Sequence, residues 1–147
     1  MKKILIALAI AVISFSAAAG SDNKPFNVKV TLTSACKLST ITDVDFTYTS
    51  LQTGAQTATG GAFTVTCTKT LPYNLRFTNI TGLTTASGTI PTVLLDYTLG
   101  LSAAGSTGNG LAQPFNVTGN MIAAQAGTCA TGSCSGTDAT QVLFVTY

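Results

Sequence analysis

Pro25-Phe26-Asn27-Val28-Lys29-Val30-Thr31-Leu32-Thr33 is the stretch that decides how the rest of the chain is interpreted. Large apolar side chains occupy every second position, at Phe26, Val28, Val30 and Leu32. Because successive side chains of a strand point to opposite faces, this alternation predicts a strand with one apolar face. Two alternatives stay open at this point: the strand completes its own sandwich, or it inserts into another molecule.

The residues before this stretch are typical of a secretory signal peptide. Lys2 and Lys3 form a positive start, an apolar run follows over 4–15, and Ala17-Ala18-Ala19 supplies a small-residue cleavage site. We therefore expect residues 1–19 to be removed on export. No later run approaches the roughly 20 apolar residues that a membrane span needs, so we expect no membrane insertion.

The charge balance of the exported chain argues against charged partners. Once residues 1–19 are removed, five lysine and arginine residues balance five aspartates, so the formal net charge is zero. Such a surface has no basic patch for nucleic acid or for anionic lipid, and a net charge near zero favours association of the chain with itself.

The pattern after the signal predicts one all-β domain. Apolar alternation recurs in short pieces that are separated by Gly, Ser, Asn and Pro, which is typical of a sandwich or a barrel. The predicted strands cover 43–48, 61–68, 73–79, 93–101, 115–117 and 140–147. The stretch 119–135 is compatible with a loop, a helical turn or a weak strand.

Four cysteines in an exported chain are expected to form disulfides, and four cysteines allow three pairings. Spacing favours a small loop closed by Cys129 and Cys134, which leaves Cys36 to pair with Cys67. A zinc site is disfavoured because the chain has no histidine and export oxidises thiols.

The residue types present also disfavour catalysis. The chain contains no histidine, and all five of its acidic residues are aspartates, so Ser-His, Cys-His and Glu-based acid/base arrangements are excluded. Asp43 and Asp45 would share one strand face as paired carboxylates. Because Val44 and Phe46 alternate with them as core residues do, the prediction is a solvated outer face. We expect no enzyme, no catalytic or metal-binding residue and no cofactor.

The last residues, 141–147, carry apolar side chains on both faces, which predicts a strand that is covered on both sides. We expect the strand that would lie beside it in an immunoglobulin-like sandwich to be missing, which leaves an apolar groove. The apolar face of Phe26–Leu32 from the next molecule could fill it. Burying four such side chains contributes about 6 to 12 kcal/mol before ordering costs. Contacts of this kind join molecules head to tail into a fibre.

The order of several motifs resembles the spore coat protein U domain, which the archaic (Csu-type) chaperone-usher pilins share. The motifs are Phe26 to Cys36, then Val44-Asp45-Phe46, Phe63-Thr64-Val65-Thr66-Cys67, Pro72-Tyr73-Asn74-Leu75 and the terminal Val145-Thr146-Tyr147. The sequence departs from the family pattern at Thr47, where glycine is usual, in lacking an aromatic-rich segment before the last strand, and in the additional cysteines Cys129 and Cys134.

The resemblance implies an incomplete immunoglobulin-like β-sandwich that is completed by donor-strand exchange. It implies a donor strand at 20–33, a pilin domain at 34–147, and Phe26, Val28, Val30 and Leu32 as the donor face. Val142, Phe144 and Tyr147 resemble the strand to which the chaperone or the donor adds.

The partners implied by the resemblance are identical or related pilin subunits, a periplasmic chaperone and an outer-membrane usher. The chain is then exported through the periplasm to a surface pilus that serves adhesion or biofilm formation. Two alternatives remain, a self-contained secreted β-sandwich that binds a glycan or a protein, and a spore-coat or matrix protein that needs no usher.

Overall fold

The computed structural model describes residues 20–77 and 83–147, which divide into two units. The first unit ends at Thr31. Its described residues have no regular secondary structure, and their side chains are exposed. Phe26 is 85% exposed and Val30 is 88% exposed. The strand expected over 26–33 is therefore absent from the single chain. The expected signal peptide, 1–19, lies outside the described residues.

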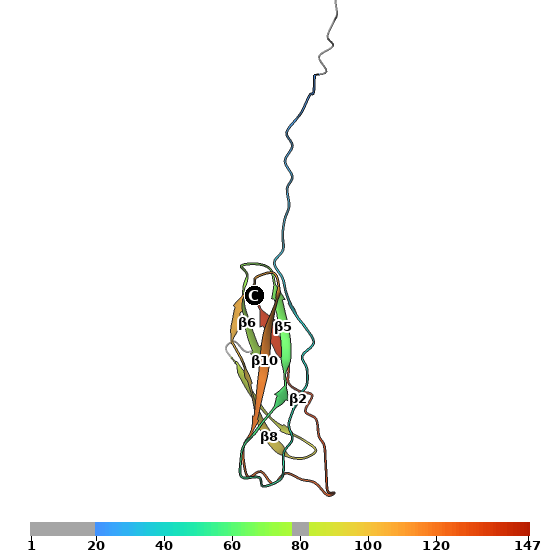
Figure 1. Ribbon diagram of the computed structural model, residues 1–147, viewed down its shortest axis with the longest axis vertical. Coiled ribbons are helices and arrows are strands. Elements are labelled where there is room, and N and C mark those ends of the chain that lie inside the picture. The colour runs from blue at the N-terminus through green and yellow to red at the C-terminus, as the bar shows by residue number, and fades with distance from the viewer. Residues whose placement is uncertain (1–19, 78–82) are drawn as a thin grey trace, which may run out of the picture. The chain divides into compact units, whose positions relative to one another are not determined.

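The second unit, Leu32–Tyr147, is built from β-strands (Figure 1), and its described residues include no helix. The described strands are β1 (Cys36–Leu38), β2 (Val44–Asp45), β3 (Gln56–Thr57), β4 (Thr59–Gly60), β5 (Ala62–Cys67), β6 (Pro72–Phe77), β7 (Thr85–Ile90), β8 (Leu95–Leu101), β9 (Gly105–Thr107), β10 (Ala112–Met121) and β11 (Leu143–Thr146). This confirms the predicted all-β class, and the arrangement is consistent with an immunoglobulin-like sandwich.

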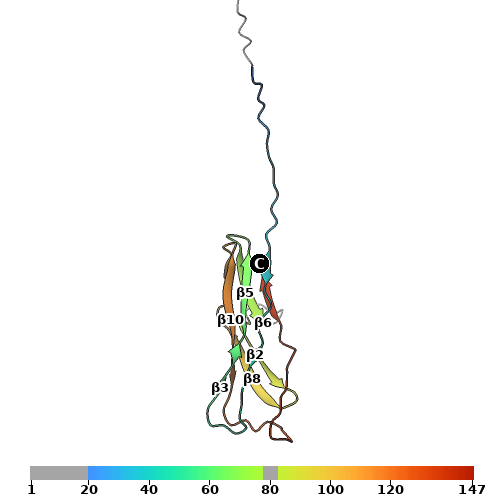
Figure 2. The ribbon, with the colours of Figure 1, turned by 45° about the vertical axis from the view of Figure 1, so that its right-hand side comes forward.

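Two antiparallel sheets face each other across the core. The larger has the order β1-β5-β10-β8-β7, with β3 paired to β10, and the smaller has the order β11-β6-β9. Strands β2 and β4 form a separate pair. In Figure 2, β5 and β10 lie side by side in one layer, and β6 lies in the other.

The core forms because the central strands alternate buried and exposed residues. Strand β5 buries Phe63, Val65 and Cys67, and β6 buries Tyr73, Leu75 and Phe77. The ring of Phe115 on β10 stacks on Phe63 at 5.7 Å between centroids, and it meets the edge of Tyr73 at 6.2 Å. Aromatic pairs in these geometries add to the stabilisation from burial. Since Tyr73 belongs to the smaller sheet, this cluster joins the two layers.

Both predicted disulfides are present. Cys36 and Cys67 are bonded, and they are also register partners between β1 and β5. Cys129 and Cys134 close a loop of five residues' separation between β10 and β11. Because Cys67 is only 2% exposed, the first disulfide attaches the edge strand β1 directly to the core.

Strand β10, Ala112–Met121, is longer than the predicted 115–117, and it includes both Pro114 and Gly119. It continues through both residues, pairing with β5 over Ala112–Asn116 and with β8 over Val117–Asn120. Proline cannot donate to a strand ladder. Pro114 is tolerated because its stretch pairs only with β5, opposite Thr64. The undecided stretch 119–135 thus begins as strand and becomes irregular after Met121.

Several other boundaries differ from the prediction. Only Val44–Asp45 of the expected strand 43–48 is a strand, and 140–147 shortens to β11. The end of the expected strand 73–79 lies outside the described residues. Strand β7 was missed because its sequence, Thr-Ala-Ser-Gly-Thr-Ile, holds small residues where a core-facing strand usually has large ones. It pairs with β8 along all six residues.

Replacing Gly61 by alanine should destabilise the fold. Gly61 has a φ of +74°, and an added Cβ would overlap the carbonyl oxygen of Val117. A left-handed non-glycine residue costs on the order of 1–3 kcal/mol, and the steric overlap adds to that cost. Urea unfolding should show this loss for G61A. The matched control is G54A, since no atom lies within 4 Å of a Cβ built at Gly54. Equal stability of G61A and G54A would contradict the conclusion that the fold requires glycine at position 61.

A candidate strand-acceptor groove

A groove of about 320 Å³ opens between the segment 41–46 and the segment 136–143. Its floor is apolar and is drawn from strands of both sheets, with Phe77 from β6, Ile90 from β7, Tyr97 and Leu99 from β8, and Val117 from β10. Its walls are Ile41–Phe46 on one side and Gly136–Leu143 on the other. The groove therefore reaches down to the core, whose residues Phe77, Tyr97, Leu99 and Val117 are each at most 7% exposed.

Each wall includes part of a strand whose outer edge has no partner within the described part of the chain. The first wall contains β2, which pairs with β4 on one side only, and the second wall ends at Leu143, the first residue of β11, which pairs with β6 on one side only. The rest of the second wall, 136–142, has no regular secondary structure. Each of β1, β2 and β11 stands at the end of its sheet order. An edge strand presents unpaired N–H and C=O groups, which can pair with an added strand. The groove thus combines an apolar floor with the free edges of β2 and, at its other border, of the start of β11.

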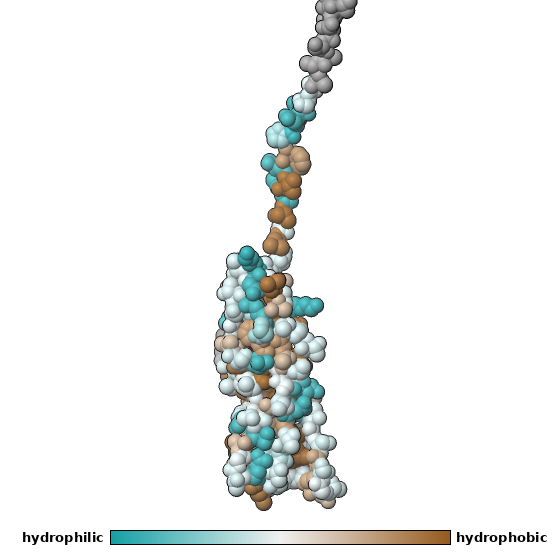
Figure 3. All heavy atoms as spheres, in the orientation of Figure 1, coloured by the Kyte–Doolittle hydropathy of each residue, from teal (hydrophilic) through white to brown (hydrophobic). Residues whose placement is uncertain are grey.

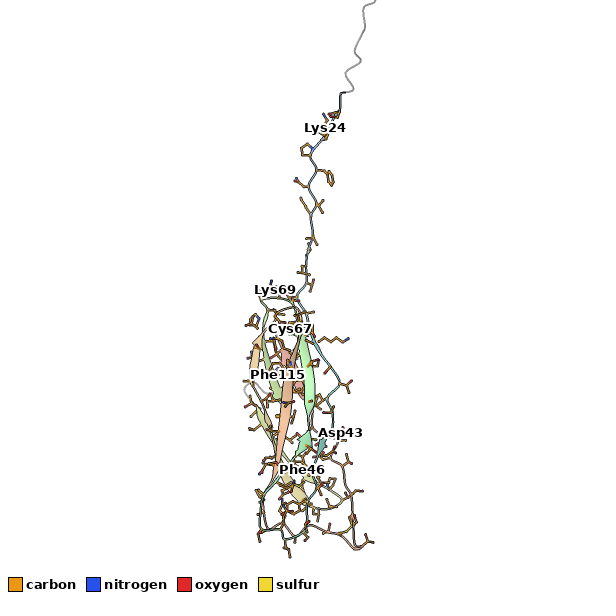
Figure 4. The ribbon with its side chains drawn as sticks, in the orientation of Figure 1. Lys24, Asp43, Phe46, Cys67, Lys69 and Phe115 are labelled. Atoms are coloured by element: carbon orange, nitrogen blue, oxygen red, sulfur yellow. A yellow bond between two sulfur atoms is a disulfide. The ribbon has the colours of Figure 1, made fainter. Side chains whose placement is uncertain are left out.

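The first wall packs onto the floor through Val44 and Phe46. A side chain at Gly119 of β10 would lie 2.6 Å from the Phe46 ring and 3.1 Å from Val44, so glycine is needed for this approach. The Phe46 ring lies 6.2 Å from the Tyr97 ring between centroids. Asp43 and Asp45 alternate with these residues and are exposed. Figure 4 shows Asp43 and Phe46 in the same part of the sandwich.

The second wall is joined to the floor by a hydrogen bond. The hydroxyl of Tyr97 donates to Oδ2 of Asp138 at 2.6 Å. The other carboxylate oxygen of Asp138 accepts from the backbone N–H of Thr140 at 2.9 Å and from its hydroxyl at 2.7 Å. Asp138 therefore fixes the turn before β11 against β8.

These contacts shift the pKa values of both partners. Hydrogen bonds from Thr140 and from Tyr97 lower the pKa of Asp138 to about 2 from its ordinary value of 3.8. Burial raises the pKa of Tyr97 to about 12, and the hydrogen bond to Asp138 adds to the rise. At neutral pH, Asp138 is therefore the charged acceptor and Tyr97 the neutral donor.

The Asp138 contacts should make stability depend on acid pH. Because the pKa of Asp138 is lower in the folded chain, its contribution is present above about pH 4 and is lost as the pH falls toward about 2. The thermal midpoint of the wild type should therefore drop more steeply between pH 5 and pH 2 than that of D138N, measured by circular dichroism. Parallel curves for the two proteins would show that Asp138 contributes nothing.

The sequence-predicted site residues are distributed unevenly around this groove. Val142 lines it, whereas Phe144 and Tyr147 are absent from its lining. On β11 it is Leu143 and Val145 that pack against the core, so Phe144 lies on the opposite face. Asp43 and Asp45 are exposed, as expected for a solvated face, and both also border the groove on its first wall.

Sequence reasoning missed several groove residues. It did not assign Tyr97, Asp138 or the wall Ile41–Phe46 to the acceptor site. The alternation of Val44, Phe46 and Tyr48 was a signal for the first wall. No signal links Asp138 to Tyr97, because 41 positions separate them and the intervening chain is irregular after β10.

The described residues contain no group of three or more His, Cys, Asp or Glu side chains that could hold a metal ion. None of their elements is a helix with the length and apolar character needed to cross a membrane. An antiparallel β-sandwich with an apolar groove between two sheet edges places the protein in the class of small β-sandwich domains.

The family model of the Spore Coat Protein U domain matches residues 22–140, and the chain belongs to this family. The family is one of structural pilin and coat domains and not of enzymes. No curated protein and no solved structure matches the chain significantly.

Proposed function

We propose that the chain is a structural subunit of a surface pilus of the chaperone-usher type, which polymerises when the N-terminal segment of one copy enters the groove of the next. The observation that carries this proposal is the groove itself, an apolar channel bordered by β2 and by the segment that leads into β11, each of which stands at the end of its sheet order. The membership of the Spore Coat Protein U family, which is associated with such pilus subunits, supports it.

The N-terminal segment fits the groove in length. From Phe26 to Leu32 an extended chain spans about 20 Å, at roughly 3.3 Å per residue. The first wall, Ile41–Phe46, would span about 17 Å by the same measure. One strand of this length can therefore lie along the whole of the first wall.

The segment also fits the groove in chemistry. Its apolar side chains are exposed in the single chain, with Val28 at 83% and Leu32 at 76% exposed. Figure 3 shows apolar and polar residues alternating along this segment. Inserted as a strand, it would bury Phe26, Val28, Val30 and Leu32 on the apolar floor, which is worth about 6 to 12 kcal/mol before ordering costs. Backbone hydrogen bonds to the two edges would add to this, as in other cases of strand addition.

An exposed apolar groove would also require protection before assembly, since such grooves favour aggregation. We propose that a periplasmic chaperone lends a strand to the groove and that an outer-membrane usher receives the subunit. The family membership supports these partners. The surface fibre would then support adhesion or biofilm formation.

The experiment that tests the proposed function follows the mass of residues 20–147 against concentration by light scattering. The expected result is a series of oligomers that grows with concentration and disappears when residues 20–33 are deleted. A chain that stays monomeric at all concentrations would contradict the proposal and favour a self-contained secreted module. Retention of all oligomers after the deletion would place the contact elsewhere on the surface.

A further inference from the structure

The charged residues are divided unequally between the two units of the chain. The described N-terminal unit, 20–31, has two lysines and one aspartate, a net charge of +1. The folded unit, 32–147, has Lys37, Lys69 and Arg76 against four aspartates, a net charge of −1. Two copies that join these units head to tail therefore bring together surfaces of opposite sign.

Among the five aspartates, all of them in the described residues, two have no side-chain partner there. Asp22 forms an ion pair with Lys24, Asp96 accepts from Thr89, and Asp138 accepts from Tyr97 and Thr140. Asp43 and Asp45 make no side-chain hydrogen bond or ion pair within the described chain. Both line the groove on its first wall.

Lys29 is the one cation inside the alternating stretch Phe26–Thr33. It has no ion-pair partner among the described residues, and it is exposed. Because side chains alternate along a strand, Lys29 points away from the floor when Val28 and Val30 point into it. On the first wall, Asp45 likewise points outward when Val44 and Phe46 pack inward.

We propose that Lys29 of an incoming copy pairs across strands with Asp43 and Asp45 of the receiving copy, and that this pairing fixes the position of the inserted strand along the groove. The inference rests on the proposed function. Residues on the same face of adjacent strands are close enough for such pairs. The other wall offers no equivalent partner, because the carboxylate of Asp138 is already bonded to Tyr97 and Thr140.

A charge-swap experiment on residues 20–147 tests the pairing. K29D should raise the concentration for half-assembly by roughly two- to thirtyfold at low salt, since an attraction becomes a repulsion. D43K/D45K should have an effect in the same direction. Combining K29D with D43K/D45K should return the concentration for half-assembly to within about threefold of that of the wild type. High salt should reduce the K29D effect, because exposed charges are screened.

The matched control is K69D, which changes the net charge by the same amount as K29D. Lys69 lies at one end of the folded unit, whereas Asp43 lies about midway along it (Figure 4). The half-assembly concentration of K69D should therefore stay near that of the wild type. The pairing would be overturned if K29D assembled like the wild type, or if the combined variant assembled no better than K29D alone. The proposed function would stand in both cases.

Two further outcomes of the charge-swap experiment also test the pairing. A wild type that never assembles would overturn the proposed function, and the pairing that rests on it falls with it. If D43K/D45K fails to fold by circular dichroism, the comparison of K29D with K69D decides alone, because Lys29 lies outside the folded unit.

Discussion

A chain carrying V28N and V30N is expected to stay monomeric at concentrations where the wild type assembles. These two residues supply half of the apolar face that the groove would bury, and their side chains are exposed in the single chain. Losing their burial costs about 3 to 6 kcal/mol, and an amide without partners on an apolar floor adds to the cost. The half-assembly concentration should therefore rise at least about a hundredfold, as measured by light scattering.

The control places substitutions on the opposite face of the same segment. N27S and T31S keep polar side chains at positions that would point away from the floor, so assembly should change little. Equal losses in the two double variants would mean that the segment does not bind through one apolar face. Unchanged assembly in V28N/V30N would exclude these residues from the contact.

The double variant C36S/C67S is expected to lose about 3 to 4 kcal/mol of the free energy of unfolding. The bond between Cys36 and Cys67 closes a loop of 31 residues' separation, and a longer loop gives a larger entropic penalty to the unfolded chain. It also holds β1 against β5, beside the first wall of the groove. Urea unfolding of the wild type and the variant under oxidising conditions measures the difference.

The second disulfide provides the comparison. Cys129 and Cys134 are exposed and lie only five positions apart in the sequence. The variant C129S/C134S should therefore lose only about 2 kcal/mol of the free energy of unfolding. A larger loss for this variant than for C36S/C67S would contradict the ranking. The loop it closes lies in the irregular segment before β11, at the positions where the sequence departs from the family pattern.

The parts of the fold that the sequence predicts well are those with strong local signals. Strands β5 and β6 alternate large apolar residues with polar ones, and the cysteine spacing in an exported chain favours the two observed disulfides. Strand β7 lacks this signal because Ala86 and Gly88 stand where larger residues would mark a buried face. Its stability comes from pairing with β8, which a local pattern does not report.

The candidate site was predicted only in part, for a similar reason. The alternating face of Phe26–Leu32 is a local pattern and can be identified from the sequence alone. The groove is a tertiary feature, which brings together Phe46, Tyr97 and Asp138 from three distant segments. The residues predicted on the last strand included Phe144, yet the register with β6 turns Leu143 and Val145 toward the core.

If the proposed assembly is right, the groove between 41–46 and 136–143 receives residues 26–32 of another copy. The most direct measurement titrates a synthetic Phe26–Thr33 peptide into isotope-labelled V28N/V30N chain, in which the groove is intact and self-assembly is suppressed, and follows backbone amide shifts by NMR. We expect saturable shifts concentrated at Ile41–Phe46 and Gly136–Leu143. Shifts confined to other surfaces, or no shifts at peptide concentrations that should saturate the groove, would contradict it.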